Sequence, residues 1–423
     1  MQNNISQGNR FYAVVAKISF LSFIFFSFFG TSLPFRPKVE EVDEISSSNL
    51  VNQIVYITLF FTSLFALIPK KKEFFKILYE EKFLTIFIIW CTASIIWSDY
   101  SFTSFKRLFQ IYCIINVTMV FLLYFNSERD LLQNIKYVLY PYLIISILSV
   151  VTIPGALDPN FRTWRALTPH KNVLGQIGVI STILCYMVYQ YEKKFNGKIL
   201  AIFMMTISVL LTVGSYSSTS IIILLIVMGF SFVFLTDKIF KPIGIRFTVS
   251  ILIVIVLIIM VFAIMIVQPT LVEVITDLFG KDTSFSGRTD LWSYMMLEIA
   301  KHPIFGTGYQ GFWIIENDSL LALYKIFVWL PNQSHNGYID IWNELGIVGL
   351  VLFSLLVLNY FISLIKLNKK HIWKTFILIS LISNWQEATF FRPGQLLSGM
   401  FIISYVMLFF ELHWQSRYKY RRD

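Results

Sequence analysis

Long apolar segments recur along the chain from end to end, with short polar segments between them. Most are close to the ~20 residues that an α-helix needs to cross the ~30 Å hydrocarbon core of a bilayer. Runs such as IIILLIVMGFSFVFL (221–235) show no period-two alternation, which favours membrane-spanning helices over the strands of a barrel. The pattern predicts an all-α polytopic membrane protein with about twelve spans, at residues 11–30, 50–69, 83–98, 108–125, 137–153, 172–190, 198–214, 217–236, 247–267, 345–365, 373–390 and 395–412.

The spacing of these spans divides the chain into three regions. Nine spans occupy residues 1–267, a large loop occupies 268–344, and three spans with a basic tail occupy 345–423. One boundary stays open, because GSYSSTS (214–220) fits either a tight turn between two spans or a polar kink in one long tilted segment.

The large loop is not plainly hydrophilic. RTDLWSYMMLEIAKHPIFG (288–306) predicts an amphipathic helix at the membrane interface, with apolar residues at Leu291, Tyr294, Met295, Leu297 and Ile299. ALYKIFVWLP (322–331) predicts a second one. We therefore expect a lid folded on the membrane rather than a separate soluble domain.

Composition supports the membrane assignment. Hydrophobic residues make up 56% of the chain and charged residues 14%, where a soluble domain has roughly 25% charged residues. The net charge of +10 is spread over loops between apolar runs, so nucleic acid is not an expected partner. Three cysteines fall inside predicted spans and indicate neither a disulfide framework nor a metal site, and the first apolar run, without a cleavage site, is interpreted as a retained span.

The distribution of Lys and Arg predicts the orientation. One side of the predicted topology collects 22 of these residues in its short loops and tail, and the other side collects 8. The positive-inside rule then places both termini in the cytoplasm, which agrees with an even number of spans. The large loop and three of the five histidines, His170, His302 and His335, lie on the outer face, whereas His371 and His413 are interpreted as residues of the inner interface.

Basic residues gather in one short outer loop around WRALTPHKNVLGQ (164–176). Arg162, Arg165, His170 and Lys171 lie ahead of a helix that starts near Asn172. A helix N-terminus adds free N–H groups and a positive dipole end, which suits phosphate or pyrophosphate. Binding of lipid headgroups is the alternative.

Two further segments of the large loop offer candidate groups. Arg288, in SFSGRTDLW, carries a planar charged fork suited to phosphate oxygens, and a simple ion pair with Asp282 or Asp290 is the alternative. In KHPIFGTGYQGFW (301–313), glycines allow a tight turn beside aromatics such as Tyr309. These rings suit either sugar stacking or anchoring at the interface.

His335 stands in SHNGYIDIWNELG, just before an apolar span. A neutral imidazole is what a general base requires near pH 7. Taken alone, however, His335 is better explained as a residue of the helix start. Glu344 lies nine residues on, so a straight helix would place it on the opposite side, and the two do not form a predicted dyad.

Three segments together resemble the O-antigen polymerase and O-antigen ligase superfamily: SGRTDLWSYMMLEIAKHPIFGTGYQGFW, SHNGYIDIWNELGIVGL and, far upstream, PHKNVLG. The resemblance is greatest to its exopolysaccharide polymerase branch. It implies a fold like that of the type C membrane glycosyltransferases, with the essential histidine at His335 and the loop arginine at Arg288. The basic HKN segment corresponds to His170, Lys171 and Asn172.

The resemblance also implies substrate-binding residues. Pyrophosphate or glycan is expected to contact Arg162, Arg165, His170, Lys171, Asn172, Trp292, Tyr309, Asn336 and Arg392. One departure concerns GSYSSTSII, where many members carry a basic residue and this chain has none. We expect Arg162, Arg165 or Arg392 to bind phosphate in place of this basic residue.

The implied activity is that of an inverting, metal-independent polysaccharide polymerase without a cofactor. It takes glycan from an undecaprenyl-pyrophosphate donor and transfers it to another lipid-linked repeat unit, on the outer face of the bacterial inner membrane. A ligase that attaches glycan to lipid A core or protein is the first alternative, and a transporter of lipid-linked sugar is the second. A chain-length regulator is an open candidate partner.

Overall fold

The computed structural model describes residues 7–30, 50–157, 163–236, 288–327, 331–367 and 373–419. Within these ranges the regular secondary structure is helical, apart from an isolated antiparallel bridge between Leu157 and Trp164. The α-helices are α1 (Gln7–Phe29), α3 (Leu50–Leu67), α4 (Lys71–Glu80), α5 (Lys82–Ala93), α6 (Ser101–Tyr124), α7 (Glu128–Thr152), α8 (Lys171–Tyr191), α9 (Phe195–Gly214), α10 (Ser218–Thr236), α12 (Arg288–Lys301), α13 (Asp318–Ile326), α14 (Gly337–Lys366), α15 (Trp373–Ser383) and α16 (Leu396–Lys419). Short 3₁₀ helices cover η1 (Ile68–Lys70), η2 (Ser94–Trp97) and η3 (Pro154–Ala156).

Seven of the described helical segments are long and apolar enough to cross a membrane. They are Arg10–Phe29, Leu50–Glu80, Ser101–Tyr124, Glu128–Thr152, Lys171–Tyr191, Phe195–Gly214 and Gly337–Lys366, with shorter apolar helices at Lys82–Trp97, Ser218–Val227 and Leu396–Leu412. The all-α polytopic membrane fold is therefore confirmed. The number of twelve spans stays a prediction, and the predicted span 247–267 lies outside the described residues.

The segment GSYSSTS is a turn between two helices. The helix α9 ends at Gly214 and α10 begins at Ser218, with Tyr216 in the left-handed region at φ +49°. The Gly214 carbonyl accepts a 2.8 Å hydrogen bond from the Trp164 backbone, and a Cβ on Gly214 would lie 2.2 Å from the Trp164 ring. The described structure thus decides between the two interpretations in favour of separate helices.

The predicted span 373–390 is wrong at its C-terminal end, because α15 ends at Ser383. The physical reason is Asn384, whose side-chain oxygen accepts hydrogen bonds from the backbone of Thr389 at 2.7 Å and of Phe390 at 2.9 Å. These bonds turn the chain out of the helix. Residues 384–395 form a loop between α15 and α16, here called the α15–α16 loop.

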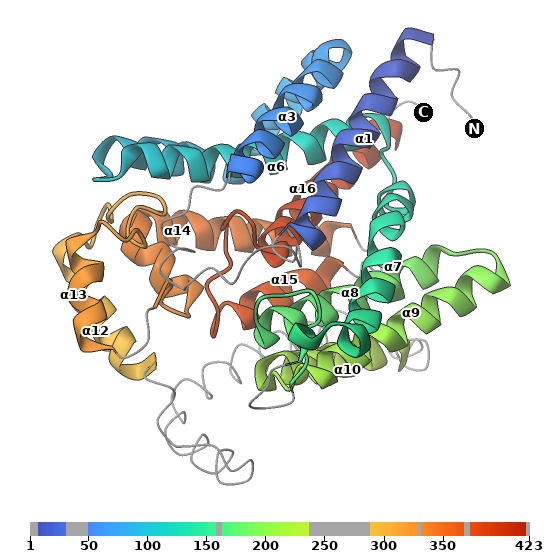
Figure 1. Cartoon of the computed structure of the whole chain (residues 1–423). Helices are drawn as coiled ribbons and strands as arrows, with labels where there is room; N and C mark the ends of the chain where they lie inside the picture. The colour runs from blue at the N-terminus through green and yellow to red at the C-terminus, as the bar shows by residue number, and fades with distance from the viewer. Residues whose placement is uncertain are drawn as a thin grey trace.

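The first predicted amphipathic helix corresponds to α12. The second, predicted at 322–331, overlaps α13, which begins four residues earlier at Asp318 and ends at Ile326. Together with Phe312, Trp313 and Ile339, α12 and α13 enclose a small hydrophobic core of their own. The buried stripe of α12 is Leu291, Met295 and Ile299, whereas Leu297, which we expected on this face, is 67% exposed. In Figure 1, α12 and α13 lie at one end of α14, and α8, α9 and α10 lie beneath α15.

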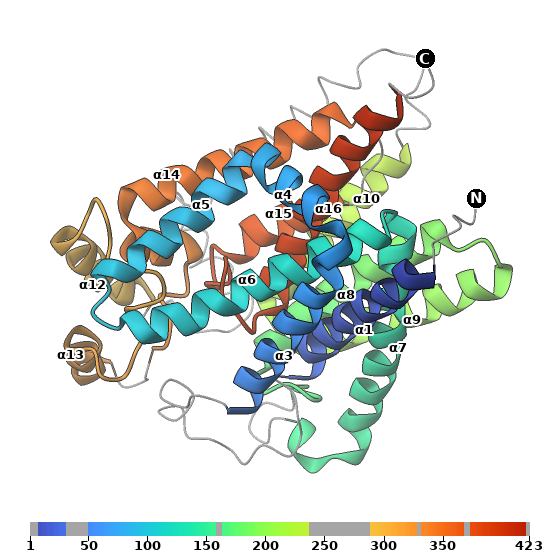
Figure 2. The same cartoon turned by 90° about the horizontal axis from the view of Figure 1, so that it is seen from above.

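The long helix α14 is broken at Gly346, which has φ +68°. The chain after α12 fills the break: the backbones of Thr307 and Gly308 donate to the Asn343 and Glu344 carbonyls, and Ile347 donates to the Pro303 carbonyl at 2.9 Å. A Cβ at Gly346 would lie 2.0 Å from the Ile304 carbonyl oxygen, so only glycine fits. The break therefore fixes the end of α12 to α14, and Figure 2 shows α5 running alongside α14.

Candidate active site

His335 lies in the turn that leads into α14, at φ +54°. Five non-glycine residues of the described chain share this left-handed conformation, so the conformation alone does not single His335 out. The turn is held on both sides: the Trp292 indole donates to the Ser334 carbonyl at 2.8 Å, and the Asn336 side chain caps α14 by accepting from the backbones of Tyr338 and Ile339. Such over-determined local strain is typical of functional positions.

The side chain of His335 faces Glu387 of the α15–α16 loop. Its Nδ1 atom lies 3.2 Å from Glu387 Oε2. The same oxygen accepts a 2.8 Å hydrogen bond from the Gln333 amide, while Arg288 Nη2 lies 3.6 Å from Oε1. Glu387 thus joins the two residues that sequence reasoning placed at the centre of catalysis.

The charge state of Glu387 follows from these contacts. Burial raises the pKa of Glu387, but the hydrogen bond and charge of His335, the charge of Arg288 and the Gln333 amide together outweigh burial and hold the pKa below its usual value. Burial lowers the pKa of Arg288, and Glu387 partly offsets that effect. A guanidinium nevertheless stays charged at neutral pH, so the pair consists of an anion and a cation.

Asn384 positions the loop that carries Glu387. Besides ending α15, its amide donates to the Ser380 carbonyl and to Thr389 Oγ1, both at 2.7 Å, and it is fully buried. Its backbone carbonyl accepts from Gly337 N at 2.7 Å, and a Cβ on Gly337 would lie 2.2 Å from Asn384 Oδ1. The α15–α16 loop and the start of α14 are therefore locked to one another beside His335.

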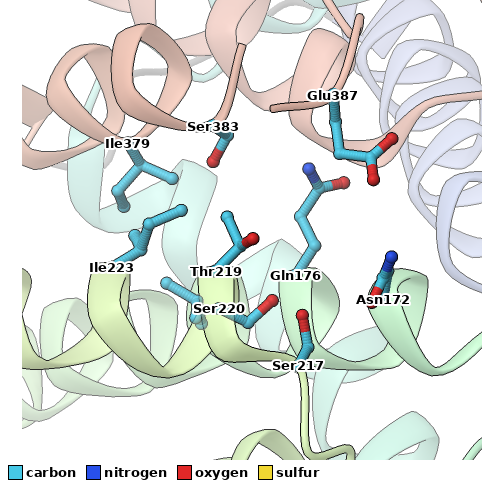
Figure 3. Close-up of a pocket in the computed structure, with 10 residues that line it drawn as sticks. Asn172, Gln176, Ser217, Thr219, Ser220, Ile223, Ile379, Ser383 and Glu387 are labelled. Carbon is cyan, nitrogen blue, oxygen red and sulfur yellow. The ribbon is translucent and has the colours of Figure 1, made fainter. Parts of the chain in front are cut away.

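Glu387 also reaches into a pocket between α8, α10 and α15, here called the polar pocket (Figure 3). Thr219 donates a hydrogen bond to the side chain of Gln386, which ties the start of α10 to the α15–α16 loop. The pocket is lined by Asn172, Gln176, Val179, Ser217, Thr219, Ser220, Ile223, Ile379, Ser383 and Glu387.

The basic upstream segment meets this pocket at one residue. Asn172 lines the pocket, and Lys171 and the exposed His170 precede it as the first residue and the N-cap of α8. Arg165 does not line the pocket, and its Nη2 donates to the Gly155 carbonyl at 3.4 Å. Arg162 lies outside the described residues.

The remaining predicted residues are engaged within the protein. Arg392 Nη2 lies 2.5 Å from Asp340 Oδ2 and 3.4 Å from Glu344 Oε1. Tyr309 is 3% exposed, and its hydroxyl donates to the Phe391 carbonyl. Asn336 is the cap described above, and the Trp292 ring lies 5.9 Å from that of Trp385 in an edge-on arrangement. Contact of these four residues with substrate remains a prediction.

Sequence reasoning missed Glu387, Gln333 and Asn384. The signal was available, because a span that contains a glutamate is costly in a membrane and such residues are usually functional. Among the described residues no group of three or more His, Cys, Asp or Glu side chains could hold a metal ion.

Comparison with known proteins bears on the same part of the chain. Residues 200–354 match a family described as O-antigen ligase, a segment that includes both Arg288 and His335. The predicted resemblance to the O-antigen polymerase and ligase superfamily is confirmed. An exopolysaccharide production protein, ExoQ of Rhizobium meliloti, is 29% identical over 99 residues, which is 22% of either chain.

Two Rickettsia proteins with the provisional name polysaccharide ligase are similar as well. The protein of Rickettsia conorii is 25% identical over 299 residues, or 68% of either chain. That of Rickettsia felis is 30% identical over 139 residues, or 31% of this chain and 33% of its own. The matched segments thus span about a fifth of ExoQ, two thirds of the first Rickettsia protein and a third of the second.

Proposed function

We propose that this protein is a polysaccharide polymerase that transfers glycan from an undecaprenyl-pyrophosphate donor to a hydroxyl of another lipid-linked repeat unit. The superfamily resemblance supports a membrane enzyme that polymerises or ligates polysaccharide. The observation that carries the proposal is the cluster of His335, Glu387 and Arg288 beside the polar pocket. We place this site on the outer face of the bacterial inner membrane, with both termini in the cytoplasm.

In this mechanism His335 acts as the general base. Glu387 accepts a hydrogen bond from the Nδ1–H of the neutral imidazole, which leaves Nε2 as the basic nitrogen. As Nε2 removes the proton of the acceptor hydroxyl, the acceptor oxygen forms a bond to the anomeric carbon of the donor. The bond from that carbon to the pyrophosphate oxygen breaks, and attack from the opposite side inverts the configuration. A carboxylate nucleophile is not needed, because the leaving group is already activated.

Arg288 would stabilise the charge that grows on the departing pyrophosphate. Its fixed cationic fork suits phosphate oxygens, and fixed charges directed at the developing negative charge are a large source of rate enhancement. His170 and Lys171 stand at the start of α8, next to the pocket-lining Asn172, where the N–H groups of the helix end add to the positive field. We assign the pyrophosphate to Arg288 and the start of α8, outside the lining of the polar pocket.

A ligase is the second candidate, favoured by the description of the matched family and by the names of the two Rickettsia relatives. Its chemistry would use the same residues, and only the acceptor would differ. Deleting the gene separates the two activities. We expect single repeat units to accumulate on the lipid carrier, whereas intact long chains left unattached would overturn the polymerase in favour of the ligase.

A further inference from the structure

The polar pocket has a lining with little charge. Its polar groups are two amides, four hydroxyls and the Glu387 carboxylate, above an apolar patch of Val179, Ile223 and Ile379. No Lys or Arg lines it. A phosphate placed there would meet a carboxylate without a compensating cation in the lining, which is electrostatically unfavourable. Hydroxyls and amides can instead donate to and accept from the hydroxyls of an uncharged ligand.

One of these hydroxyls has no hydrogen-bond partner among the described residues. Ser383 is 2% exposed, and its Oγ makes no hydrogen bond to any described residue. Figure 3 shows it directed from the end of α15 toward Thr219 on α10. A buried polar group without a partner is unfavourable. Other buried hydroxyls, such as that of Ser181, also lack a hydrogen bond to a described residue, but Ser383 is the one that lines the polar pocket, where a ligand can bond to it.

Glu387 links the polar pocket to the catalytic cluster. The Glu387 carboxylate, on the α15–α16 loop, lines the pocket and also contacts His335 at 3.2 Å. A ring held among the amides and hydroxyls therefore lies next to the group that orients the base. Arg288, 3.6 Å from the other carboxylate oxygen, does not line the pocket.

We propose that the polar pocket binds an uncharged sugar ring of the glycan, separately from the pyrophosphate. Gln176 and Asn172 on α8, together with the Ser383 hydroxyl on α15, hold the ring hydroxyls, while the isoleucine and valine side chains face its C–H surface. That the sugar belongs to a transferred glycan rests on the proposed function. The separation into a sugar site and a pyrophosphate site rests on the lining alone.

The test measures binding rather than turnover, with purified full-length protein in detergent. One probe is the phosphate-free oligosaccharide repeat unit released from the organism's own polysaccharide, and the other is undecaprenyl pyrophosphate without sugar. Ser383→Ala and Gln176→Ala each remove one pocket group. Ser181→Ala is the matched control, because Ser181 is also fully buried with an unpartnered Oγ but lies on α8 outside the pocket.

We expect Ser383→Ala and Gln176→Ala to bind the oligosaccharide about twofold to tenfold more weakly, the range for loss of one neutral hydrogen bond. Ser181→Ala should bind it like the wild type, and all three should bind undecaprenyl pyrophosphate unchanged. Weaker binding of undecaprenyl pyrophosphate, or unchanged oligosaccharide binding in both pocket variants, would overturn the sugar site.

Steady-state transfer then distinguishes the source of the sugar. A rise in KM for the acceptor assigns the ring to the acceptor, and a rise in KM for the donor assigns it to the donor; both outcomes support the site. A protein that binds the oligosaccharide through this pocket but forms no glycosidic bond would retain the sugar site and contradict the polymerase.

Discussion

Two centres of this protein pair an arginine with glutamate or aspartate, and their differences separate structure from chemistry. In the first centre, Arg392 lies between Asp340 and Glu344, whose side chains are 4% and 7% exposed. In the second, Arg288 meets Glu387, whose side chain is 22% exposed and lines a pocket. The two arginine side chains are equally exposed at 17%, so the difference lies in the carboxylates: those of the first centre are buried, whereas that of the second lines a pocket.

Partners distinguish the two centres as clearly as exposure does. Asp340 accepts hydrogen bonds from Arg392, the Trp313 indole and the Ser334 backbone, and Glu344 accepts from the Gln310 backbone. The first centre, formed by Arg392, Asp340 and Glu344, therefore ties the chain after α12 and the α15–α16 loop to α14. Glu387 instead contacts a titratable histidine at a 3.2 Å distance and an arginine at 3.6 Å, both longer than the 2.5 Å contact between Arg392 and Asp340.

Loss of the base should have the largest effect on activity. His335→Ala should lower polymerisation by about 10²–10⁴-fold, the usual contribution of a general base, while protein level and thermal stability stay normal. The assay is the length distribution of polysaccharide in a deletion strain that carries the variant. His371→Ala, in a predicted inner loop, is the control and should be close to silent; full activity in His335→Ala would eliminate the base.

Loss of the structural arginine should act on folding instead. Arg392→Met leaves two buried carboxylates uncompensated, so we expect a loss of about 3–5 kcal/mol of stability and a lower protein level. Thermal unfolding in detergent measures this, with Arg129→Met on the exposed surface of α7 as the control. A stable but inactive Arg392→Met protein would instead indicate a catalytic role for Arg392. It would contradict the distinction between a structural and a catalytic centre.

Glu387 is a positioning residue, and its loss should be milder than that of His335. Glu387→Gln should lower kcat by about a hundredfold through misplacement of the base, with little change in donor KM and in protein level. Glu387→Asp, which keeps the charge, should retain more activity than Glu387→Gln, and the exposed Glu73→Gln is the control. Equal loss in Glu387→Asp and Glu387→Gln, together with poor folding, would indicate a purely structural role.

The smallest effect concerns stability against pH. The pKa of Glu387 lies below its usual 4.5 in the folded protein, so its charge stabilises the fold fully above that pH and progressively less as pH falls through the folded-state pKa. The difference in melting temperature between wild type and Glu387→Gln should therefore shrink as the pH falls below 4.5. A difference that persists unchanged well below pH 4.5 would contradict the assigned contacts.

Much of the fold could be predicted because long apolar runs leave a helix few alternatives in lipid. The end of α15 could not, since it depends on Asn384 bonding to backbone groups five and six residues later. The break at Gly346 was also missed, because its hydrogen-bond partners come from the chain after α12. Both are tertiary effects without a local hydrophobic signature.

The candidate site shows the same division. His335 and Arg288 were found through motif resemblance and orientation, but the residue that joins them, Glu387, is 52 positions from His335 and fell inside a predicted span. Helical geometry did not favour Glu344 as a partner of His335, and in the described structure the Glu344 carboxylate lies beside Arg392. The sequence indicates that His335 and Arg288 are candidates. Only the geometry of the α15–α16 loop shows that Glu387 contacts both of them.

The most direct test of the central claim uses purified protein and lipid-linked repeat units, with the formation of new glycosidic bonds followed by gel separation of product lengths. The account predicts a ladder of products from wild type, a strongly reduced ladder from Glu387→Gln and almost none from His335→Ala, with all three proteins equally folded. Equal ladders from the wild type and from His335→Ala would contradict it.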